Sequence, residues 1–377
     1  MHLPSLIITT ILTYLGMPDL SWKTARKHKR ELMQLRTEMH MLSDDFSRVK
    51  ANEDAYPNAY FAYNFPINYM KTRYVMDTVS RLYRSRMDKR YLKVLDIGCG
   101  EGAGLFGVYH AHPDLDKIVL HGFDTSRSMI NKCRYVARSL YDTDRRLRVR
   151  IHQRDISDGL LKTQKKYDII ILSNSLIELT MDAVKAHRFL LRISKNLEPE
   201  GMIIIIEPAL VTASQRLMEL RELMVEKRKL QVLLPCLHES ACPLVDLRGG
   251  KEWCHQSIRW RPPEYLQVIN QGLNRDINML KFSYLIVSRN APAKPDGLLA
   301  VSSLMKEKGR KRCFLCTPDG RVEIARLNKH KSLINKNFDL ICKGTVIALD
   351  TVEKRRSDYW IVTKDSRVEL LFGYDLS

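Results

Sequence analysis

A glycine-rich turn is the first feature of the sequence whose residue types could bind a cofactor. The run VLDIGCGEGAG, residues 94–104, places Asp96 before glycines at positions 98, 100, 102 and 104. Glycines let a chain turn, and leave its backbone accessible, where a bound molecule must lie against it. Asp124, 22 residues after Gly102, ends the next apolar run and is placed to accept hydrogen bonds from ribose hydroxyls. The sequence therefore predicts a nucleoside-containing cofactor at this turn.

Two cofactors are compatible with such a turn. GCGEGA, residues 98–103, satisfies the relaxed dinucleotide pattern G-x-G-x-x-A, so a nicotinamide enzyme is one interpretation. Asp96 favours S-adenosylmethionine instead, because its carboxylate can hold the donor's amino group and would repel a pyrophosphate. Asp155, at the end of the third apolar run, suits the exocyclic amine of adenine, and no second catalytic domain follows Arg289. We expect the methyl donor to be bound by Asp96, Gly98, Cys99, Gly100, Gly102, Asp124, Asp155 and Asn174.

The residues that would catalyse methyl transfer leave few marks in the sequence. The fourth apolar run ends in LSNSLIEL, where Asn174 and Glu178 would face the reaction site. The tetrapeptide of amino-directed base methylases (Asn or Asp, Pro, Pro, aromatic) is missing from the sequence. Methyl transfer depends mainly on positioning an in-line attack and excluding water, so its machinery can be sparse. Asn174 either positions substrate or donor or is a turn residue at a strand end, and we assign no catalytic base.

Four cysteines form a second group that could do chemistry. Cys236, Cys242 and Cys254 follow one another with five and then eleven residues between them, and Cys316 is the natural fourth. Thiolates flanked by Pro and His, rather than by a core-like apolar run, are typical of a metal site. The alternative is that these are ordinary buried cysteines of a reducing compartment.

Zinc and an iron–sulfur cluster compete for this site. Zinc sites usually contain C-x-x-C pairs, and the only such pair here is Cys313 with Cys316, while His238 and His255 are further possible ligands. Wider spacings suit a cluster that takes its ligands from separate loops. The remaining cysteines lie in the glycine turn or in apolar surroundings, and we interpret their side chains as packing groups: Cys99, Cys133 and Cys342.

The elements that must position these residues alternate along the chain. LKVLDIG, IVLHGFD, RVRIHQRD, YDIIILSN and GMIIIIEP are short runs rich in Ile, Val and Leu, separated by helix-length segments. This pattern is typical of a parallel sheet buried on both faces in a doubly wound α/β fold. A helix from about Ser214 to Arg228, an irregular Cys-rich segment, and the closing strands HQSIRW and LKFSYLIVSR follow. Together with the donor turn, they predict a Rossmann-like class I S-adenosylmethionine-dependent methyltransferase fold.

The two ends of the chain predict smaller regions. A basic amphipathic helix is expected between Asp19 and Lys50, and the Tyr-rich segment after it leads through turns into a helix ending near Met87. The PDG turn at 318–320 and the alternation in DYWIVTKDSRVELLF predict hairpins of a small barrel-like module. We therefore expect an N-terminal helical region (1–88), a methyltransferase-like domain (89–290) with a Cys-rich metal-binding insertion (231–256), a basic linker (291–312) and a small β-rich C-terminal module (313–377).

The composition indicates an acidic partner. The 377 residues include 62 Lys and Arg against 43 Asp and Glu, a formal net charge of +19. Nucleic acid is the partner that this balance favours, and a solvated basic surface is the alternative. The apolar stretch from Leu3 to Met17 is too short to span a bilayer and is broken by Pro4, so we expect no membrane partner.

Several of these motifs together resemble a known family. DIGCGEG, IIEPAL, PCLHESACPL, WCH and CTPDG are similar to segments of the Rsm-type family of small-ribosomal-subunit methyltransferase-like proteins, and the similarity runs from LPSLI to CTPDGRVE. The resemblance implies a role in maturing or translating the small ribosomal subunit, with binding to its rRNA. It also implies a four-iron four-sulfur cluster on Cys236, Cys242, Cys254 and Cys316, with a longer gap between Cys242 and Cys254 than in the mitochondrial homologue.

Three functions follow from these observations. The first is an enzyme that methylates rRNA, and the second is a non-catalytic iron–sulfur assembly factor that binds rRNA. The third is a small-molecule methyltransferase, whose activity would be insensitive to salt, whereas RNA binding through many cations weakens steeply with salt. We expect a monomer, in the cytoplasm if the protein is bacterial and in the mitochondrial matrix if it is eukaryotic. We expect the start LPSLIITTIL to belong to the fold itself, which favours the bacterial type.

Overall fold

The computed structural model describes residues 2–47, 55–155, 165–179, 182–245 and 252–373. They form two compact units, each described below by itself. The first unit contains Met1–Met76, Lys89–Ser173 and Arg259–Leu280, and the second contains Asp77–Asp88, Asn174–Ile258 and Lys281–Ser377. No helix within the described residues is both long enough and apolar enough to cross a membrane.

The N-terminal region is helical, as predicted. Its helices are α1 (Ser5–Tyr14), α2 (Lys29–Ser47), α3 (Pro57–Leu82) and α4 (Arg84–Met87). The basic amphipathic helix is α2, which begins ten residues later than its predicted start at Asp19. The turns predicted in the Tyr-rich segment are wrong, because Pro57 occupies the first helical position, where proline is tolerated, and the segment is helical from there.

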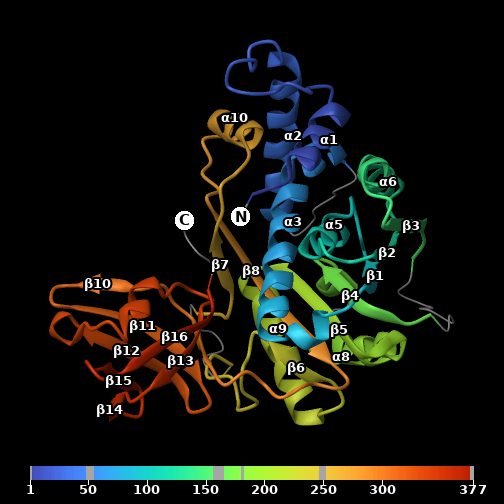
Figure 1. The fold of residues 1–377 in the computed structure, drawn as a ribbon. Helices are drawn as coiled ribbons and strands as arrows, with labels where there is room; N and C mark the ends of the chain where they lie inside the picture. The colour runs from blue at the N-terminus through green and yellow to red at the C-terminus, as the bar shows by residue number, and fades with distance from the viewer. Residues whose placement is uncertain (1, 48–54, 156–164, 180–181, 246–251, 374–377) are drawn as a thin grey trace. The chain divides into compact units, whose positions relative to one another are not determined.

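The sheet of the first unit confirms the first four predicted strands. They are β1 (Tyr91–Ile97), β2 (Lys117–Asp124), β3 (Leu147–Gln153) and β4 (Tyr167–Ser173). Their spatial order is β3-β2-β1-β4, and all neighbours are parallel. Helix α5 (Ala103–Ala111) follows β1 and helix α6 (Arg127–Thr143) follows β2, as the colours along the chain show (Figure 1). The unit also includes α10 (Glu264–Leu273).

The second unit begins with further α/β structure. Its elements are α7 (Leu176–Leu179), α8 (Ala183–Ile193), the 3-10 turn η1 (Ser194–Asn196), β5 (Leu197–Pro208), α9 (Val211–Lys227), β6 (Gln231–Leu234), β7 (Gln256–Arg259) and β8 (Met279–Ser288). β8 is antiparallel to both β5 and β6, and β7 pairs with β8. The orders β3-β2-β1-β4 and β5-β8-β6 are those of the two halves of a class I methyltransferase sheet, which confirms the α/β fold class.

One strand of this region was missing from the sequence-based prediction. β6 occupies Gln231–Leu234, at the start of the segment predicted to be irregular. It has only four residues and is followed directly by Pro235 and Cys236, so no alternating run marks it in the sequence. The predicted closing strands HQSIRW and LKFSYLIVSR are confirmed as β7 and β8.

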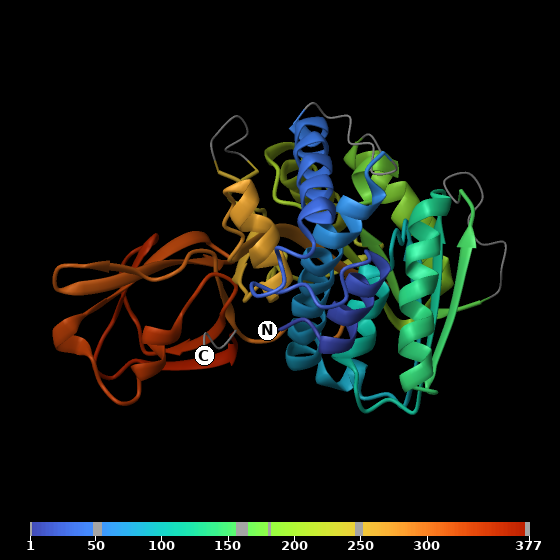
Figure 2. The same ribbon diagram turned by 90° about the horizontal axis from the view of Figure 1, so that it is seen from above.

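The C-terminal part of the second unit is a separate β-sheet. Its strands are β9 (Leu298–Ala300), β10 (Met305–Glu307), β11 (Arg310–Thr317), β12 (Gly320–Leu327), β13 (Val346–Asp350), β14 (Glu353–Arg356), β15 (Tyr359–Val362) and β16 (Arg367–Phe372). They lie in the order β14-β15-β12-β11-β9-β13-β16, with β10 on β11, and the 3-10 turns η2 (Asn328–His330) and η3 (Lys336–Leu340) follow β12. The region is drawn in orange and red in Figures 1 and 2.

Two predictions for this region are wrong in part. The stretch 291–312 contains β9, β10 and the start of β11, so it is not a linker throughout. β9 and β10 have only three residues each, which is too short for an alternating pattern to show in the sequence. The PDG turn does join the antiparallel pair β11 and β12. The run DYWIVTKDSRVELLF, however, forms β15 and β16, which pair with β12 and β13 instead of with each other.

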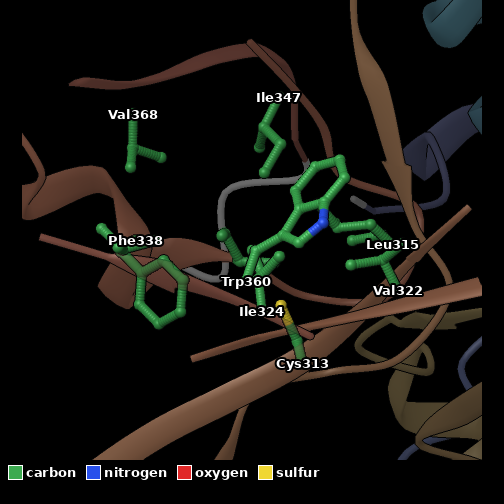
Figure 3. Close-up of a cluster of buried hydrophobic side chains, with 11 residues drawn as sticks. Cys313, Leu315, Val322, Ile324, Phe338, Ile347, Trp360 and Val368 are labelled. Atoms are coloured by element: carbon green, nitrogen blue, oxygen red, sulfur yellow. The ribbon is translucent and has the colours of Figure 1, made fainter. Parts of the chain in front are cut away.

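The core of this sheet decides the role of one cysteine. Cys313, Leu315, Val322 and Ile324 point into one apolar cluster with Trp360 and other side chains (Figure 3). Cys313 has no exposed surface, and Cys316, three residues later on the same strand, is paired with Arg321 rather than with a core position. Residues three apart on a strand point to opposite faces. Cys313 and Cys316 therefore cannot act together as a C-x-x-C pair of ligands, and Cys313 stays outside the predicted ligand set.

Candidate functional site

The glycine turn lies between β1 and α5 in the first unit. Gly98, Gly100 and Gly102 have φ angles of +75°, +50° and +88°, in the left-handed region that favours glycine. A Cβ atom on Gly102 would lie 2.5 Å from Cε2 of Phe106 and 2.6 Å from Sγ of Cys133. Around Gly100 a Cβ atom would meet nothing within 4 Å in the described part of the chain. The turn is therefore packed tightly against α5 and α6 at Gly102 and is open at Gly100.

Asp96 is buried at the end of β1, beside this turn. Its side chain is 1% exposed, and among the described residues its Oδ1 atom has no hydrogen-bond partner. Burial, and then the charge of Asp124, raise the pKa of Asp96 to about 8. A Cβ atom on Gly104 would lie 2.6 Å from Oδ2 of Asp96, so only glycine fits there. An unpaired buried carboxylate oxygen is what a cationic amino group would complete.

Asp124 fixes the turn to the end of β2. Its Oδ2 accepts a hydrogen bond from the backbone N–H of Gly100 at 2.7 Å, and its Oδ1 accepts one from the N–H of Ser126 at 2.8 Å. A carboxylate oxygen can accept more than one hydrogen bond, which binding of a ligand hydroxyl at Asp124 would require. The carboxylate is thus held in place by the backbone on both sides.

Gly98 and Cys99 complete the attachment of the turn to β2. Their backbone N–H groups donate to the carbonyl oxygen of Phe123 at 2.8 and 3.0 Å. The Cys99 thiol is buried, and a Cβ atom on Gly122 would lie 2.7 Å from its Sγ. The Cys99 side chain is therefore a packing group, and only its backbone belongs to the turn's binding surface.

The other two predicted donor-binding residues lie elsewhere. Asp155 is exposed, two residues beyond the end of β3, and its role stays a prediction. Asn174 belongs to the second unit, has a φ of +57°, and donates its N–H to the carbonyl oxygen of Ile206 at 2.7 Å. Its Oδ1 atom is buried without a partner among the described residues. Glu178 is exposed on α7.

Glu207 is a buried acid that the sequence analysis did not single out. It is 2% exposed near the end of β5, and its Oε1 accepts hydrogen bonds from the N–H groups of Leu176 at 3.0 Å and Ile177 at 3.4 Å. Glu207 therefore holds the start of α7, directly after Asn174. An acid at the end of the apolar run GMIIIIEP was the signal that could have identified it.

The four predicted metal-ligating cysteines all lie in the second unit. Cys236 follows β6, Cys242 lies six residues further, Cys254 precedes β7, and Cys316 is on β11. Burial, and then the three other thiols, raise the pKa of Cys254 far above its usual range. Burial, and then two of these thiols, raise the pKa of Cys316 to about 12. The structure therefore gathers the four thiols in one neighbourhood.

The four thiols lie near one another, but they are not arranged as ligands around a metal ion. Among the described residues, no three His, Cys, Asp or Glu side chains stand together as they would around a metal ion. Coulomb interactions act over longer distances than metal–sulfur bonds, which are about 2.3 Å long. Thiols can therefore raise one another's pKa although they are too far apart to bind the same metal ion. The cysteines thus have the chemistry of a metal-binding set, and their side chains would have to turn toward one another to coordinate.

Three cations surround these cysteines. Arg221, which is 3% exposed, interacts with Cys236 and donates Nη2 to the carbonyl oxygen of His238 at 2.8 Å. Lys294 donates its Nζ to the carbonyl oxygen of Cys236 at 2.9 Å. Lys343 lies near Cys254, and burial lowers the pKa of both lysines. One buried and two half-buried cations favour negative charge on the nearby thiols.

A cavity of about 280 Å³ lies at this site, lined by residues that include Met218, Cys236, Cys242, Trp253, Cys254 and Lys343. The two histidines beside it differ. His238 places Nε2 3.2 Å from Sγ of Cys316, whereas both ring nitrogens of His255 are engaged, Nδ1 with the carbonyl of Trp253 and Nε2 with Lys343. His255 is therefore the weaker candidate ligand.

Comparison with protein families gives one match. The model described as mitochondrial small ribosomal subunit Rsm22 matches residues 54–340. The matched range contains the glycine turn and all four cysteines. A search of curated proteins returns no match.

Solved methyltransferase structures show a weak overall likeness. The plantazolicin methyltransferase BpumL, in complex with a pentazolic desmethylPZN analog and SAH, is 13% identical, covers 69% of this chain and 99% of its own, and has a TM-score of 0.38. A precorrin-6y C5,15-methyltransferase from Geobacter metallireducens is 14% identical over 58% of this chain and 87% of its own, with a TM-score of 0.33. The sugar N-methyltransferase KedS8 from a Streptoalloteichus species is 21% identical, covers 37% of this chain and 47% of its own, and has a TM-score of 0.26. At these values the likeness decides nothing about the chemistry of this chain.

Proposed function

This chain belongs to the Rsm22 family, and from that premise we propose that it is an S-adenosylmethionine-binding, methyltransferase-like protein acting on the small ribosomal subunit. The observation that carries the donor assignment is the buried Asp96 with its unpaired Oδ1, next to a glycine turn that Asp124 holds in place. An amino group and a ribose are the ligand groups that these two acids suit.

Each residue of the turn has a distinct task in this proposal. Asp96 binds the donor's amino group, the backbone from Gly98 to Gly102 lies against the ligand, and Asp124 accepts hydrogen bonds from the ribose. Asp155 holds the exocyclic amine of adenine, and Asn174 positions donor or substrate. When bound, the donor supplies a methyl group activated by its sulfonium charge. The chain's own contribution is to orient that group and exclude water, which requires no base.

A single-turnover assay tests the enzymatic form of the proposal. The full chain is mixed with donor carrying a labelled methyl group and with small-subunit particles, and label on the rRNA is measured. Asp124→Ala should abolish transfer because it removes both the turn's anchor and the ribose acceptor, whereas the exposed Asp114→Ala is the matched control and should not. Absence of label on rRNA with the unaltered chain would reject the enzyme.

The second candidate is a non-catalytic assembly factor that binds rRNA. It is favoured by the net charge of +19 and by the missing base-methylase tetrapeptide. It predicts that the chain binds small-subunit particles and donor but leaves no label on the rRNA. In either form, we expect the protein in the mitochondrial matrix if it is eukaryotic and in the cytoplasm if it is bacterial. We also expect it to be a monomer.

The cysteines form the metal centre of this proposal, a four-iron four-sulfur cluster on Cys236, Cys242, Cys254 and Cys316, with zinc as the alternative. Two observations support the cluster over zinc: Cys313 lies in an apolar core and cannot pair with Cys316 as a C-x-x-C ligand, and the four thiols are widely spaced, three between β6 and β7 and one on β11. The surrounding Lys294 and Lys343 would balance part of the negative charge of four thiolates, whereas Arg221 is also paired with Glu222 at 2.6 Å. Anaerobically purified protein should be brown with equal iron and sulfide, and colourless protein carrying zinc would reject the cluster.

A further inference from the structure

A basic groove lies in the first unit, on the outer strand of its described sheet. Helix α6 and strand β3 run side by side in both ribbon views (Figures 1 and 2). Between them is a shallow cavity of about 570 Å³, lined by Arg134, Ala137, Arg138, Tyr141, Arg148, Val149 and Ile151. Three of these seven residues are arginines and none is acidic, so the groove presents positive charge over a small apolar floor.

The sequence explains why these arginines gather. Arg134, Arg138 and Tyr141 are spaced four and three residues apart on α6, so they share one helix face, and all three are exposed. The opposite face of α6 is buried through residues such as Val136 and Leu140. Arg148 comes from the neighbouring strand β3 and completes the groove.

Tyr141 organises the cations around it. Its ring is 37% exposed, with the guanidinium carbon of Arg145 at 4.6 Å and that of Arg148 at 5.5 Å from the ring centroid. Guanidinium groups held against an aromatic ring are attracted by its π-electrons and lose less freedom when they bind a ligand. The ring and the guanidinium planes also offer flat surfaces to a planar ligand.

These arginines are not neutralised by acids. Within the part of the chain that the structure describes, Arg134, Arg138, Arg145 and Arg148 form no ion pair, and Arg134 and Arg148 donate only to backbone carbonyls. Nearby Arg146 differs, because it is paired with Asp144 at 2.6 Å. The arginines of the groove are therefore available to an external anion.

We propose that this groove, which we call the α6–β3 groove, binds single-stranded RNA. Planar guanidinium groups match phosphate oxygens in pairs, and aromatic rings and guanidinium planes are the surfaces on which unpaired bases stack. An anionic membrane would require apolar side chains that project outward, but Ala137, Val149 and Ile151 form a partly covered floor. The α6–β3 groove names a contact surface for the RNA partner of the proposed function, yet the argument depends only on the groove itself.

The test measures binding of the full chain to a fluorescently labelled single-stranded RNA of roughly a dozen nucleotides, by anisotropy over a series of salt concentrations. The double variant Arg138→Gln/Arg148→Gln should bind about tenfold more weakly at low salt, with a salt slope smaller by about 1.4, the value for two lost contacts to a single strand. The matched control is Arg355→Gln/Arg367→Gln, which removes two exposed arginines from β14 and β16. Equal weakening by both pairs, or by neither, would overturn the proposal.

Variants of Tyr141 separate the ring from the charge. Tyr141→Phe keeps an aromatic ring and should bind RNA within about twofold of the unaltered chain, whereas Tyr141→Leu should bind roughly fivefold more weakly. Thermal unfolding checks that the variants are folded. Vesicles of anionic lipid are the competing ligand: binding to vesicles but not to RNA would overturn the assignment. Donor binding should be unchanged in all these variants, so failure of the groove and failure of the proposed function give different results.

Discussion

The glycine turn of the first unit and the cysteine site of the second are built in opposite ways. The turn is one continuous segment, residues 96–104, anchored by a single acid from the next strand. The cysteine site gathers residues spread from Arg221 to Lys343. The ionisable groups also differ: acids, with Asp96 buried, lie at the turn, and Arg221 with two half-buried lysines lies among the cysteines. Each site thus carries the charge opposite to that of its proposed ligand, a cationic methyl donor and an anionic metal–thiolate centre.

The largest expected effect is the difference in bound metal between variants of two cysteines on β11. Cys316→Ser should reduce bound metal by at least about tenfold, because it removes one of four thiolate ligands. Cys313→Ser should keep the metal and instead lower the free energy of unfolding by about 1–3 kcal/mol, since it buries a hydroxyl in an apolar core. Iron and zinc analysis beside denaturant unfolding measures both. Loss of metal from both variants alike would contradict the assignment of Cys313 to the core.

Two glycines offer the matching test at the turn. Gly102→Ala combines a left-handed φ with atoms at 2.5 and 2.6 Å, so it should destabilise the fold by about 2–4 kcal/mol and abolish donor binding. Gly100→Ala meets no atom within 4 Å and should cost only about 1 kcal/mol. Thermal unfolding of the two variants measures the difference. Equal destabilisation would show that packing at Gly102 does not shape the turn.

The raised pKa of Asp96 predicts a pH dependence of stability. Its pKa is about 8 in the folded chain and about 4 when unfolded, so between these pH values the folded state binds the extra proton. Stability should therefore fall as pH rises from about 4 to about 8, and Asp96→Asn should remove this decline, a gain at pH 8 on the order of a few kcal/mol. Denaturant unfolding at pH 5 and pH 8 measures it. If the stability of Asp96→Asn falls by the same amount between pH 5 and pH 8, the decline comes from the titration of other groups.

The smallest effect concerns the cations of the cysteine site. Lys343→Gln should hasten loss of metal to a chelator about two- to fivefold, because one balancing charge is removed while all four thiols remain. The exposed Lys331→Gln is the control, because Lys331 is paired with Asp339 at 3.5 Å and does not line the cavity at the cysteines; it should release metal at the unaltered rate. Identical rates of metal release from both variants would show that Lys343 does not stabilise the bound metal.

The contrast between the two sites also explains what the sequence could reveal. Strands β1 to β5 follow from their apolar runs, and the acids Asp96 and Asp124 follow because they end such runs. The cations of the cysteine site could not be foreseen, since Lys294 and Lys343 reach it only through the folding of distant segments. The same limit applies to β9 and β10, because each has only three residues and is too short to show an alternating pattern.

Calorimetric titration of the full chain with S-adenosylhomocysteine tests the central claim most directly. Asp96 is protonated below pH 8 in the free chain and must ionise to pair with the ligand's amino group. Titrations at pH 7 in two buffers of different ionisation enthalpy should therefore give one ligand per chain, with release of close to one proton, and at pH 9 the release from Asp96 should vanish. Absence of binding, or binding with no proton release at pH 7, would contradict the account of an acid-lined donor site at the glycine turn.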